Sequence, residues 1–277
     1  FIQWHIGSSK DEQIVLLKYL GYNNLDELIA KTVPEKILLK ENLSIAKEIA
    51  REAGDFLLDN KNKTKQIFSE EGRDIKLEID RATETRIKKS LKDTGIPVLG
   101  EEFGGNSISE NSYLWVIDPL DGTSNYFRGL DQCCVSIALL KGTEGLIGVI
   151  YNFNTDEMFE SAKGMGAFLN GQKIKVSDVD KREKGYLTTG FPSSKEMKVN
   201  EEFISLLKEF KKVRMFGSAA LSCAYIASGK CDFYTEKGVY IWDFAAGISL
   251  IEEAGGSVNF AEISEGRYSV SFSNGKI

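Results

Sequence analysis

The strongest signal in the chain is the stretch Trp115-Val116-Ile117-Asp118-Pro119-Leu120-Asp121-Gly122-Thr123. It predicts an apolar strand that runs out into a turn holding two aspartates three residues apart. Pro119 fixes its own φ and lacks an N–H donor, while Gly122 permits a tight bend that leaves backbone amides open. Converging carboxylates beside open amides suit a hard divalent cation together with a phosphate. From these residues alone, the alternative is an Asp-Pro turn that only shapes a loop.

Two further carboxylate groups lie outward from this stretch. Glu101 and Glu102 follow the strand-like run Val98-Leu99-Gly100. Adjacent glutamates are usually solvated, so this pair alone is weak support for a site. Asp243 lies in Trp242-Asp243-Phe244, among bulky apolar neighbours, where a carboxylate is costly unless it is paired or binds a metal. Asp243 would also lie at the start of a helix, where the helix dipole stabilises an anion.

Composition narrows the classes of function. The chain has 277 residues, a formal net charge of -6 and a pI near 5.2, which argues against non-specific nucleic-acid binding. Its one histidine, His5, excludes a His-based metal site and a Ser-His-Asp triad, so any metal must be held mostly by oxygen. The four cysteines form no CxxC pair and are expected to be buried thiols of a reducing cytosol. We find no signal peptide and no apolar run of membrane length, so a soluble, cytoplasmic protein is expected.

The rest of the chain divides into a helical start and a mixed core. Residues 1–40 predict a small helical unit, and residues 43–57 predict a longer amphipathic helix with apolar residues at three- and four-residue steps. Residues 60–74 are polar and predict a surface turn or mobile loop before another helix over 75–92. Short strands are expected at 98–99, 113–117, 133–140, 146–151, 158–161 and 167–169, and helices at 200–211, 219–227 and 244–253. Alternating blocks of helices and strands predict layered α/β or α+β packing rather than a barrel.

Three motifs, in one order, resemble those of the inositol monophosphatase family. They are Gly100-Glu101-Glu102, the stretch 115–126, and Trp242-Asp243-Phe244-Ala245-Ala246-Gly247, with supporting stretches at 164–170, 217–225 and 253–256. The resemblance covers about residues 41–277. It implies an α+β fold, a layered αβαβα sandwich of the inositol monophosphatase or fructose-1,6-bisphosphatase type. It also implies Mg²⁺-dependent hydrolysis of small phosphate monoesters that is commonly inhibited by lithium.

The resemblance further implies roles for individual residues. The implied metal ligands are the carboxylates of Glu101, Asp118, Asp121 and Asp243 and the backbone carbonyl of Leu120. Glu101 and Thr123 would position a water held by one metal, and Asp80 on the early helix would partner Thr123. The implied substrate contacts are Asp121, Gly122, Thr123, Ala219, Glu236 and Asp243. Hydrolysis by an activated water needs no covalent intermediate and no histidine, which agrees with the composition.

The residues after Thr123 bear on the substrate. Ser124-Asn125-Tyr126 resembles the inositol-phosphatase branch, and the nucleotidase branch typically has a Lys-Glu-Phe run there. Inositol-1-phosphate or a similar polyol phosphate is therefore the expected substrate. Fructose-1,6-bisphosphate and 3′-phosphoadenosine 5′-phosphate stay open as alternatives. Some bacterial relatives also bind transcription or ribosome-assembly machinery, which is an alternative of another class. The family is often dimeric, so a homodimer is expected.

Residues 1–40 resemble a different family, the glycine-cleavage P-protein. The similar stretches are 5–9, 12–13, 20–22, 25–29 and 32–34. Trp4 and Ser8 depart from that family's pattern, and the lysine that holds its pyridoxal phosphate has no counterpart here, so decarboxylase activity is not predicted. We expect a helical arm, with a second short helix from Asn24, that packs on the phosphatase or on a second subunit. His5 is expected to be a surface or packing residue. The predicted domains are thus 1–40 and 41–277.

Overall fold

The computed structural model describes residues 10–23, 35–63, 67–71, 74–105, 109, 112–191 and 201–277. The chain divides into two compact units, Phe1–Glu41 and Asn42–Ile277. The first unit contains helix α2 (Lys10–Tyr19), which confirms a helix around Leu16 and Leu17. His5 and the second short helix predicted from Asn24 lie outside the described residues. Among the helices of the described ranges, none is long and apolar enough to cross a membrane.

Eight strands of the second unit form its larger sheet, in the order β10-β9-β8-β7-β6-β5-β3-β4. Their bounds are β3 Val98–Gly100, β4 Gly104–Gly105, β5 Tyr113–Asp121, β6 Cys134–Lys141, β7 Glu144–Asn152, β8 Glu157–Ala162, β9 Gly166–Leu169 and β10 Gln172–Ile174. Neighbouring strands are antiparallel except for β3 and β5, which are parallel. Strands β5, β6 and β7 are buried almost throughout, because helices cover both faces of the sheet.

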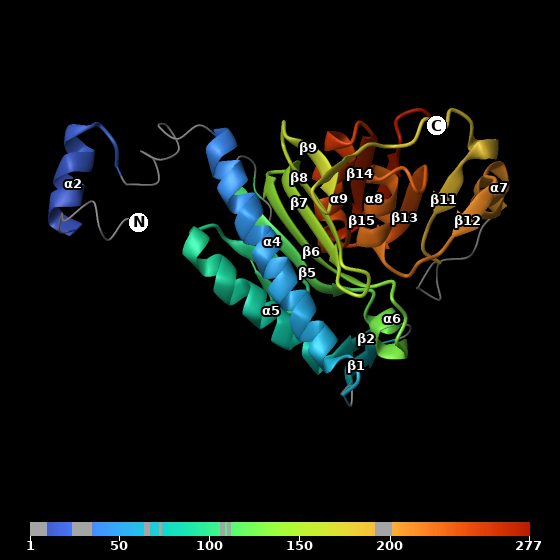
Figure 1. The fold of residues 1–277 in the computed structure, drawn as a ribbon, viewed down its shortest axis with the longest axis horizontal. Helices are drawn as coiled ribbons and strands as arrows, with labels where there is room; N and C mark the ends of the chain where they lie inside the picture. The colour runs from blue at the N-terminus through green and yellow to red at the C-terminus, as the bar shows by residue number, and fades with distance from the viewer. Residues whose placement is uncertain are drawn as a thin grey trace. The chain divides into compact units, whose positions relative to one another are not determined.

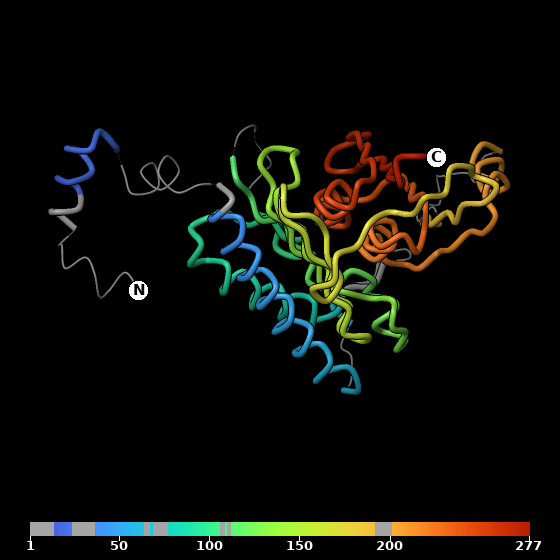
Figure 2. Tube along the Cα trace, turned by 45° about the horizontal axis from the view of Figure 1, so that its top comes forward, coloured from blue at the N-terminus to red at the C-terminus, as the bar shows by residue number. Residues whose placement is uncertain are grey.

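One face of this sheet is covered by α5 (Glu78–Leu91) and by the part of α4 (Glu35–Asn60) that belongs to the second unit (Figures 1 and 2). The buried apolar residues of α4 recur at the predicted helical spacing: Ala46, Ile49, Ala50, Ala53 and Leu57. Lys47 of α4 forms an ion pair with the buried Glu160 of β8. The predicted amphipathic helix over 43–57 is therefore confirmed.

The other face of the large sheet packs on α8 (Ala219–Ala227) and α9 (Ile241–Glu253), which lie between the two sheets (Figure 1). The smaller sheet has the order β12-β11-β13-β15-β14. Its bounds are β11 Tyr186–Thr188, β12 Lys212–Arg214, β13 Phe233–Val239, β14 Ser257–Ser264 and β15 Arg267–Ser273. Helix α7 (Glu201–Glu209) packs on its outer face, where Leu206 and Leu207 contact Leu187 and Phe233. The layers run helix, sheet, helix, sheet, helix, which confirms the predicted αβαβα sandwich.

The turn or loop predicted over 60–74 is wrong in its second half. Strand β1 (Ile67–Glu71) pairs antiparallel with β2 (Asp74–Leu77), so β2 delays the start of α5 to Glu78. The strands were not predicted because their two short apolar runs, one of which begins at Ile67, lie among many lysines and glutamates. The ribbon is not isolated, because the Arg81 guanidinium lies 4.4 Å from the centroid of the Phe68 ring.

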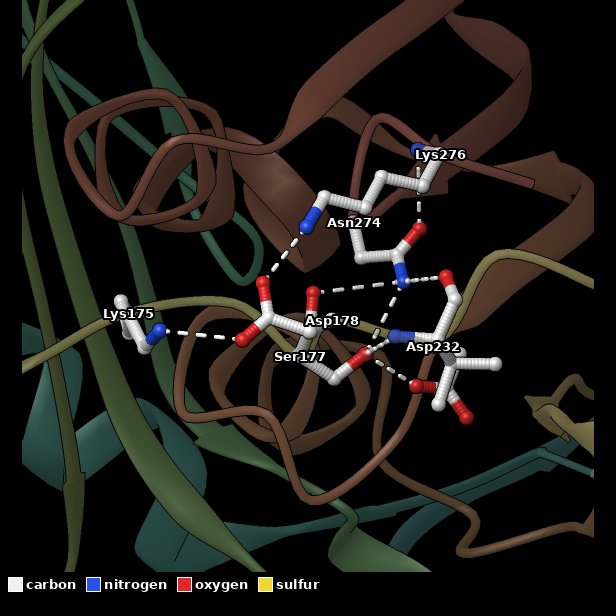
Figure 3. A network of polar contacts seen from close by, with 7 residues as sticks. Lys175, Ser177, Asp178, Asp232, Asn274 and Lys276 are labelled. Carbon is white, nitrogen blue, oxygen red and sulfur yellow. Dashed lines mark hydrogen bonds and ion pairs between the residues drawn. The ribbon is translucent and has the colours of Figure 1, made fainter.

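A polar network fastens the linker between the two sheets to the segment just after β15 (Figure 3). Ser177 on the linker donates to the buried Asp232 carboxylate and accepts from Asn274 Nδ2 at 2.9 Å. The Asp232 carboxylate also accepts the Tyr186 amide at 2.6 Å. Asp178 is paired with two lysines on the same linker and segment. A buried carboxylate is tolerated here because each of its oxygens has a donor.

Candidate active site

Two parallel strands end side by side at the candidate site. Gly100, the last residue of β3, is in register with Ile117 of β5. The next residues along each strand are Glu101 and Asp118, so both carboxylates lie at the same sheet edge. The predicted convergence of these two groups therefore follows from a parallel pairing that the sequence does not reveal directly.

The stretch between Asp118 and Asp121 was predicted as a turn, and this is wrong: it remains part of β5. Asp118 is opposite Ser136 and Asp121 is opposite Cys134, so one strand advances three residues while the other advances two. This is a bulge, and Pro119 suits it because it has no N–H to offer the neighbouring strand. Within the bulge the Asp118 carboxylate accepts the Leu120 amide at 3.0 Å.

The chain then turns sharply into α6 (Thr123–Arg128). Gly122 adopts φ 90°, a conformation that disfavours residues with a side chain. The Thr123 hydroxyl donates to the Leu120 carbonyl at 3.0 Å. The carbonyl predicted to bind metal and the hydroxyl predicted to orient water are thus in contact.

Asp121 lies against the start of α8, almost a hundred residues away along the chain. Its Oδ2 accepts the Ala220 amide at 2.8 Å and the Ser218 hydroxyl, and its Oδ1 accepts the Ala219 amide at 3.3 Å. Free amides at a helix N-terminus stabilise an anion in this position. The structure therefore brings Asp121 and Ala219 together, as their predicted shared role requires.

Asp243 lies in the first turn of α9, which begins at Ile241, three residues before the predicted start at 244. Its Oδ2 accepts the Tyr240 amide at 2.7 Å, which caps the helix. Burial, followed by the charges of Asp121 and Glu101, raises the pKa of Asp243. This carboxylate is therefore close to two of the other predicted ligands.

The same causes act on the two aspartates of β5. Burial raises the pKa of Asp118, and the charges of Glu101, Asp121 and Asp243 raise it further. Burial also raises the pKa of Asp121, although the Ser218 hydroxyl and the α8 amides oppose this effect. Four carboxylates are thus close enough to repel one another in a desolvated setting. Such an excess of negative charge is typical of a functional site.

Glu236, on β13, lies on the side of the site formed by the smaller sheet. Its Oε2 accepts from the Tyr234 hydroxyl at 3.0 Å. Burial raises the pKa of Glu236 to about 7, assisted by the charge of Asp121 and opposed by its hydrogen bonds from Tyr234 and the Gly190 amide. The group therefore titrates near neutral pH and is close to Asp121.

Asp80 is buried in the first turn of α5, where it accepts the Leu77 amide at 2.9 Å. Burial, followed by the charges of Cys133 and Asp80, raises the pKa of Tyr126 in α6. Asp80 is therefore close to the helix that Thr123 begins. The predicted contact between Asp80 and Thr123 stays a prediction.

The donor set fits a hard cation, since it consists of carboxylates, a backbone carbonyl and a hydroxyl. Among the residues that the structure describes, no three His, Cys, Asp or Glu side chains are arranged to hold a metal ion. Asp121 and Asp243 instead direct carboxylate oxygens to backbone amides. A cation would relieve the mutual repulsion that raises the pKa values of these groups.

Comparisons with known proteins agree with this geometry. The model of the inositol monophosphatase family matches residues 38–270. The chain belongs to the inositol monophosphatase family. It is 40% identical over 230 residues to a protein of Xylella fastidiosa named Nus factor SuhB, covering 79% of this chain and 82% of the relative. It is 35% identical over 225 residues to a fructose-1,6-bisphosphatase/inositol-1-monophosphatase of Aquifex aeolicus, covering 79% and 85%.

A solved structure agrees as well. The inositol monophosphatase from Anabaena superposes with a TM-score of 0.75 at 37% identity, covering 86% of this chain and 92% of that one. Inositol monophosphatases are metal-dependent phosphatases, and this member of the family is a phosphatase. The family resemblance read from residues 41–277 is therefore confirmed.

The sequence patterns did not identify two residues that lie at the site, Ser218 and Glu84. Ser218 precedes α8 and both caps it, through the Leu221 amide at 3.2 Å, and donates to Asp121. A serine directly before an apolar helix is a capping signal that could have identified it. Glu84 binds the turn after Glu101. Its position four residues after Asp80, on the same helix face, was the available signal.

Proposed function

We propose that this member of the inositol monophosphatase family hydrolyses inositol-1-phosphate, or a similar small polyol phosphate, with Mg²⁺. The observation that carries the proposal is the gathering of Asp118, Asp121 and Asp243 beside Glu101 with raised pKa values. The cluster is costly for the fold in the absence of a cation, and chemistry on a charged phosphate ester explains why it is kept.

In this proposal the metal ligands are the carboxylates of Glu101, Asp118, Asp121 and Asp243 together with the Leu120 carbonyl. Bound Mg²⁺ would neutralise charge on the phosphate and lower the pKa of a water ligand. Mg²⁺ keeps several waters and needs few protein carboxylates per ion, so four carboxylates could serve more than one ion.

The remaining residues act on the water and the substrate. Glu101 and the Thr123 hydroxyl accept hydrogen bonds from the attacking water, and Asp80 orients Thr123. The amides of Gly122 and Thr123 donate to the phosphate. Ala219 and Glu236 contact the hydroxyl-bearing part of the substrate, together with Asp121 and Asp243. Glu236 supports this role because its pKa near 7 lets it accept or donate a hydrogen bond at neutral pH.

The alternative substrates are fructose-1,6-bisphosphate and 3′-phosphoadenosine 5′-phosphate. The Aquifex aeolicus relative supports the first, because its name joins fructose-1,6-bisphosphatase with inositol-1-monophosphatase. We favour the polyol phosphate because Ser124-Asn125-Tyr126 resembles the inositol-phosphatase branch.

A second candidate function is binding to transcription or ribosome-assembly machinery. The Xylella fastidiosa relative named Nus factor SuhB favours it. The net charge of -6 does not favour a direct contact with RNA. We therefore propose any such role as an addition to catalysis. Capture of transcription proteins from a bacterial extract by both wild type and a catalytically dead variant would support it.

Several expectations stay predictions: lithium inhibition, a homodimer, a cytoplasmic location and a division into domains at about residue 40. The likeness of residues 1–40 to the glycine-cleavage P-protein also stays a prediction, and so does their proposed role as a packing arm.

The test is phosphate release from inositol-1-phosphate, fructose-1,6-bisphosphate, 3′-phosphoadenosine 5′-phosphate and glycerol-2-phosphate, with and without Mg²⁺ and with added lithium. We expect Mg²⁺-dependent, lithium-sensitive release that is fastest with inositol-1-phosphate. A folded protein that releases no phosphate from any of them would contradict the proposal.

A further inference from the structure

Glu84 is a buried carboxylate that no substrate or metal role uses. It lies on α5, one turn after Asp80, and its side chain is fully enclosed. Its two oxygens point to the turn that follows β3. Oε2 accepts the Glu102 amide at 2.7 Å, and Oε1 accepts the Phe103 amide at 3.2 Å. One carboxylate therefore fixes the two backbone amides directly after Glu101.

Glu84 also fixes the backbone before Glu101. A Cβ atom built on Gly100 would overlap Glu84 Oε1 and lie 2.8 Å from Oε2. No side chain fits there unless the carboxylate moves, so the glycine lets β3 approach α5. Residues 100, 102 and 103 thus all lie against the same carboxylate, and Glu101 is held between them.

Lys88 completes this arrangement. Its Nζ lies 2.7 Å from Glu84 Oε1 and donates to the Gly104 carbonyl at 2.8 Å. The pair neutralises the buried charge of Glu84 and ties the far end of the turn to the same helix. Arg81, on the same helix, lies 4.8 Å from the centroid of the Phe103 ring. The helix therefore binds the turn at each residue from 102 to 104.

We propose that Glu84 is a positioning residue for the metal site, holding the turn so that the Glu101 carboxylate faces Asp118. The inference rests on the proposed function, since it needs Glu101 to be a metal ligand. Partners that orient a ligand change metal affinity by about 10- to 100-fold when they are lost. Glu84→Gln replaces one acceptor with an NH₂ group that faces a backbone N–H, so it should release the turn without changing the size of the side chain.

The test is calorimetric titration of the substrate-free protein with Mn²⁺, a substitute for Mg²⁺, alongside thermal unfolding. The matched control is Glu160→Gln, which alters a second buried carboxylate paired with a lysine, Lys47. We expect Glu84→Gln to weaken Mn²⁺ binding by at least about tenfold. Glu160→Gln should lower the melting temperature and leave the Mn²⁺ affinity of the folded protein unchanged.

A second variant keeps the test usable if Glu84→Gln does not fold. Gly100→Ala keeps the glutamate at position 84, but the added Cβ would displace its carboxylate, so this variant should also weaken Mn²⁺ binding. Wild-type affinity in a folded Glu84→Gln or Gly100→Ala protein would overturn the inference while leaving the proposed function intact. If wild type and Glu160→Gln bind no Mn²⁺ and release no phosphate, the proposed function fails and this inference fails with it.

Discussion

Two regions of the second unit contain buried carboxylates whose surroundings differ. At the linker network, Asp232 is buried with a hydroxyl and a backbone amide as donors. At the end of β5, Asp118 is buried beside three other carboxylates that raise its pKa. The first arrangement stabilises the fold, and the second opposes it. Since Asp118 and Asp121 also accept backbone amides, the like charges beside Asp118 are what distinguish the candidate site from the linker network.

The largest effect should come from Asp118. Asp118→Asn removes one charge from the cluster and one proposed metal ligand, so turnover should fall by about 10³-fold or more while the chain still folds. Phosphate release at saturating Mg²⁺, with thermal unfolding as the control for folding, measures this. Because the charge is unfavourable to the folded state, the variant should be at least as stable as wild type without metal. Retained turnover at saturating Mg²⁺ would end the proposed role of Asp118.

Glu236 should show the pH dependence of the same region. Its folded pKa is about 7 against an ordinary value of 4.5, so the folded state holds the proton more tightly than the unfolded chain. Stability should therefore fall as the pH rises from about 4.5 to about 7, by up to about 3 kcal/mol. Glu236→Gln should reduce this decline, which urea unfolding at a series of pH values measures; the raised pKa values of Asp118, Asp121 and Asp243 act in the same direction and remain in the variant. An unchanged slope in the variant would mean that another group causes it.

The linker network should give the smallest effect on catalysis and a moderate one on stability. Ser177→Ala removes a donor to Asp232 and an acceptor for Asn274, which should lower the free energy of unfolding by about 1–3 kcal/mol. The rate of phosphate release per folded molecule should stay at the wild-type value. A loss of turnover without a loss of stability would break the distinction between the two regions.

Much of the fold was predictable because local signals agreed with the tertiary structure. The apolar run Ala219–Ala227 was predicted as a helix and has those bounds. The fully apolar start of β5 is typical of a buried strand, and a strand was predicted there. The ribbon β1-β2 was not predictable in the same way, since its two short apolar runs are separated by charged residues.

The candidate site was predictable in its members and not in its contacts. Asp118 and Asp121 were identified because converging carboxylates beside open amides suit a cation and a phosphate, and because their stretch resembles the inositol monophosphatase family. The binding of Asp121 to Ala220 joins residues 99 positions apart, which no local pattern reports. Glu84 looked like an ordinary helical glutamate, because only the folded chain brings the Glu102 amide to it.

We infer that the carboxylates around Asp118 are held together for a cation. The most direct measurement is thermal unfolding of the wild-type protein as Mg²⁺ is titrated, repeated with Asp118→Asn. The melting temperature of wild type should rise with Mg²⁺, more at pH 8 than at pH 5, because the raised pKa values make protons compete with the metal. Asp118→Asn should lose most of that rise. A wild-type melting temperature that does not respond to saturating Mg²⁺ at either pH would contradict this inference.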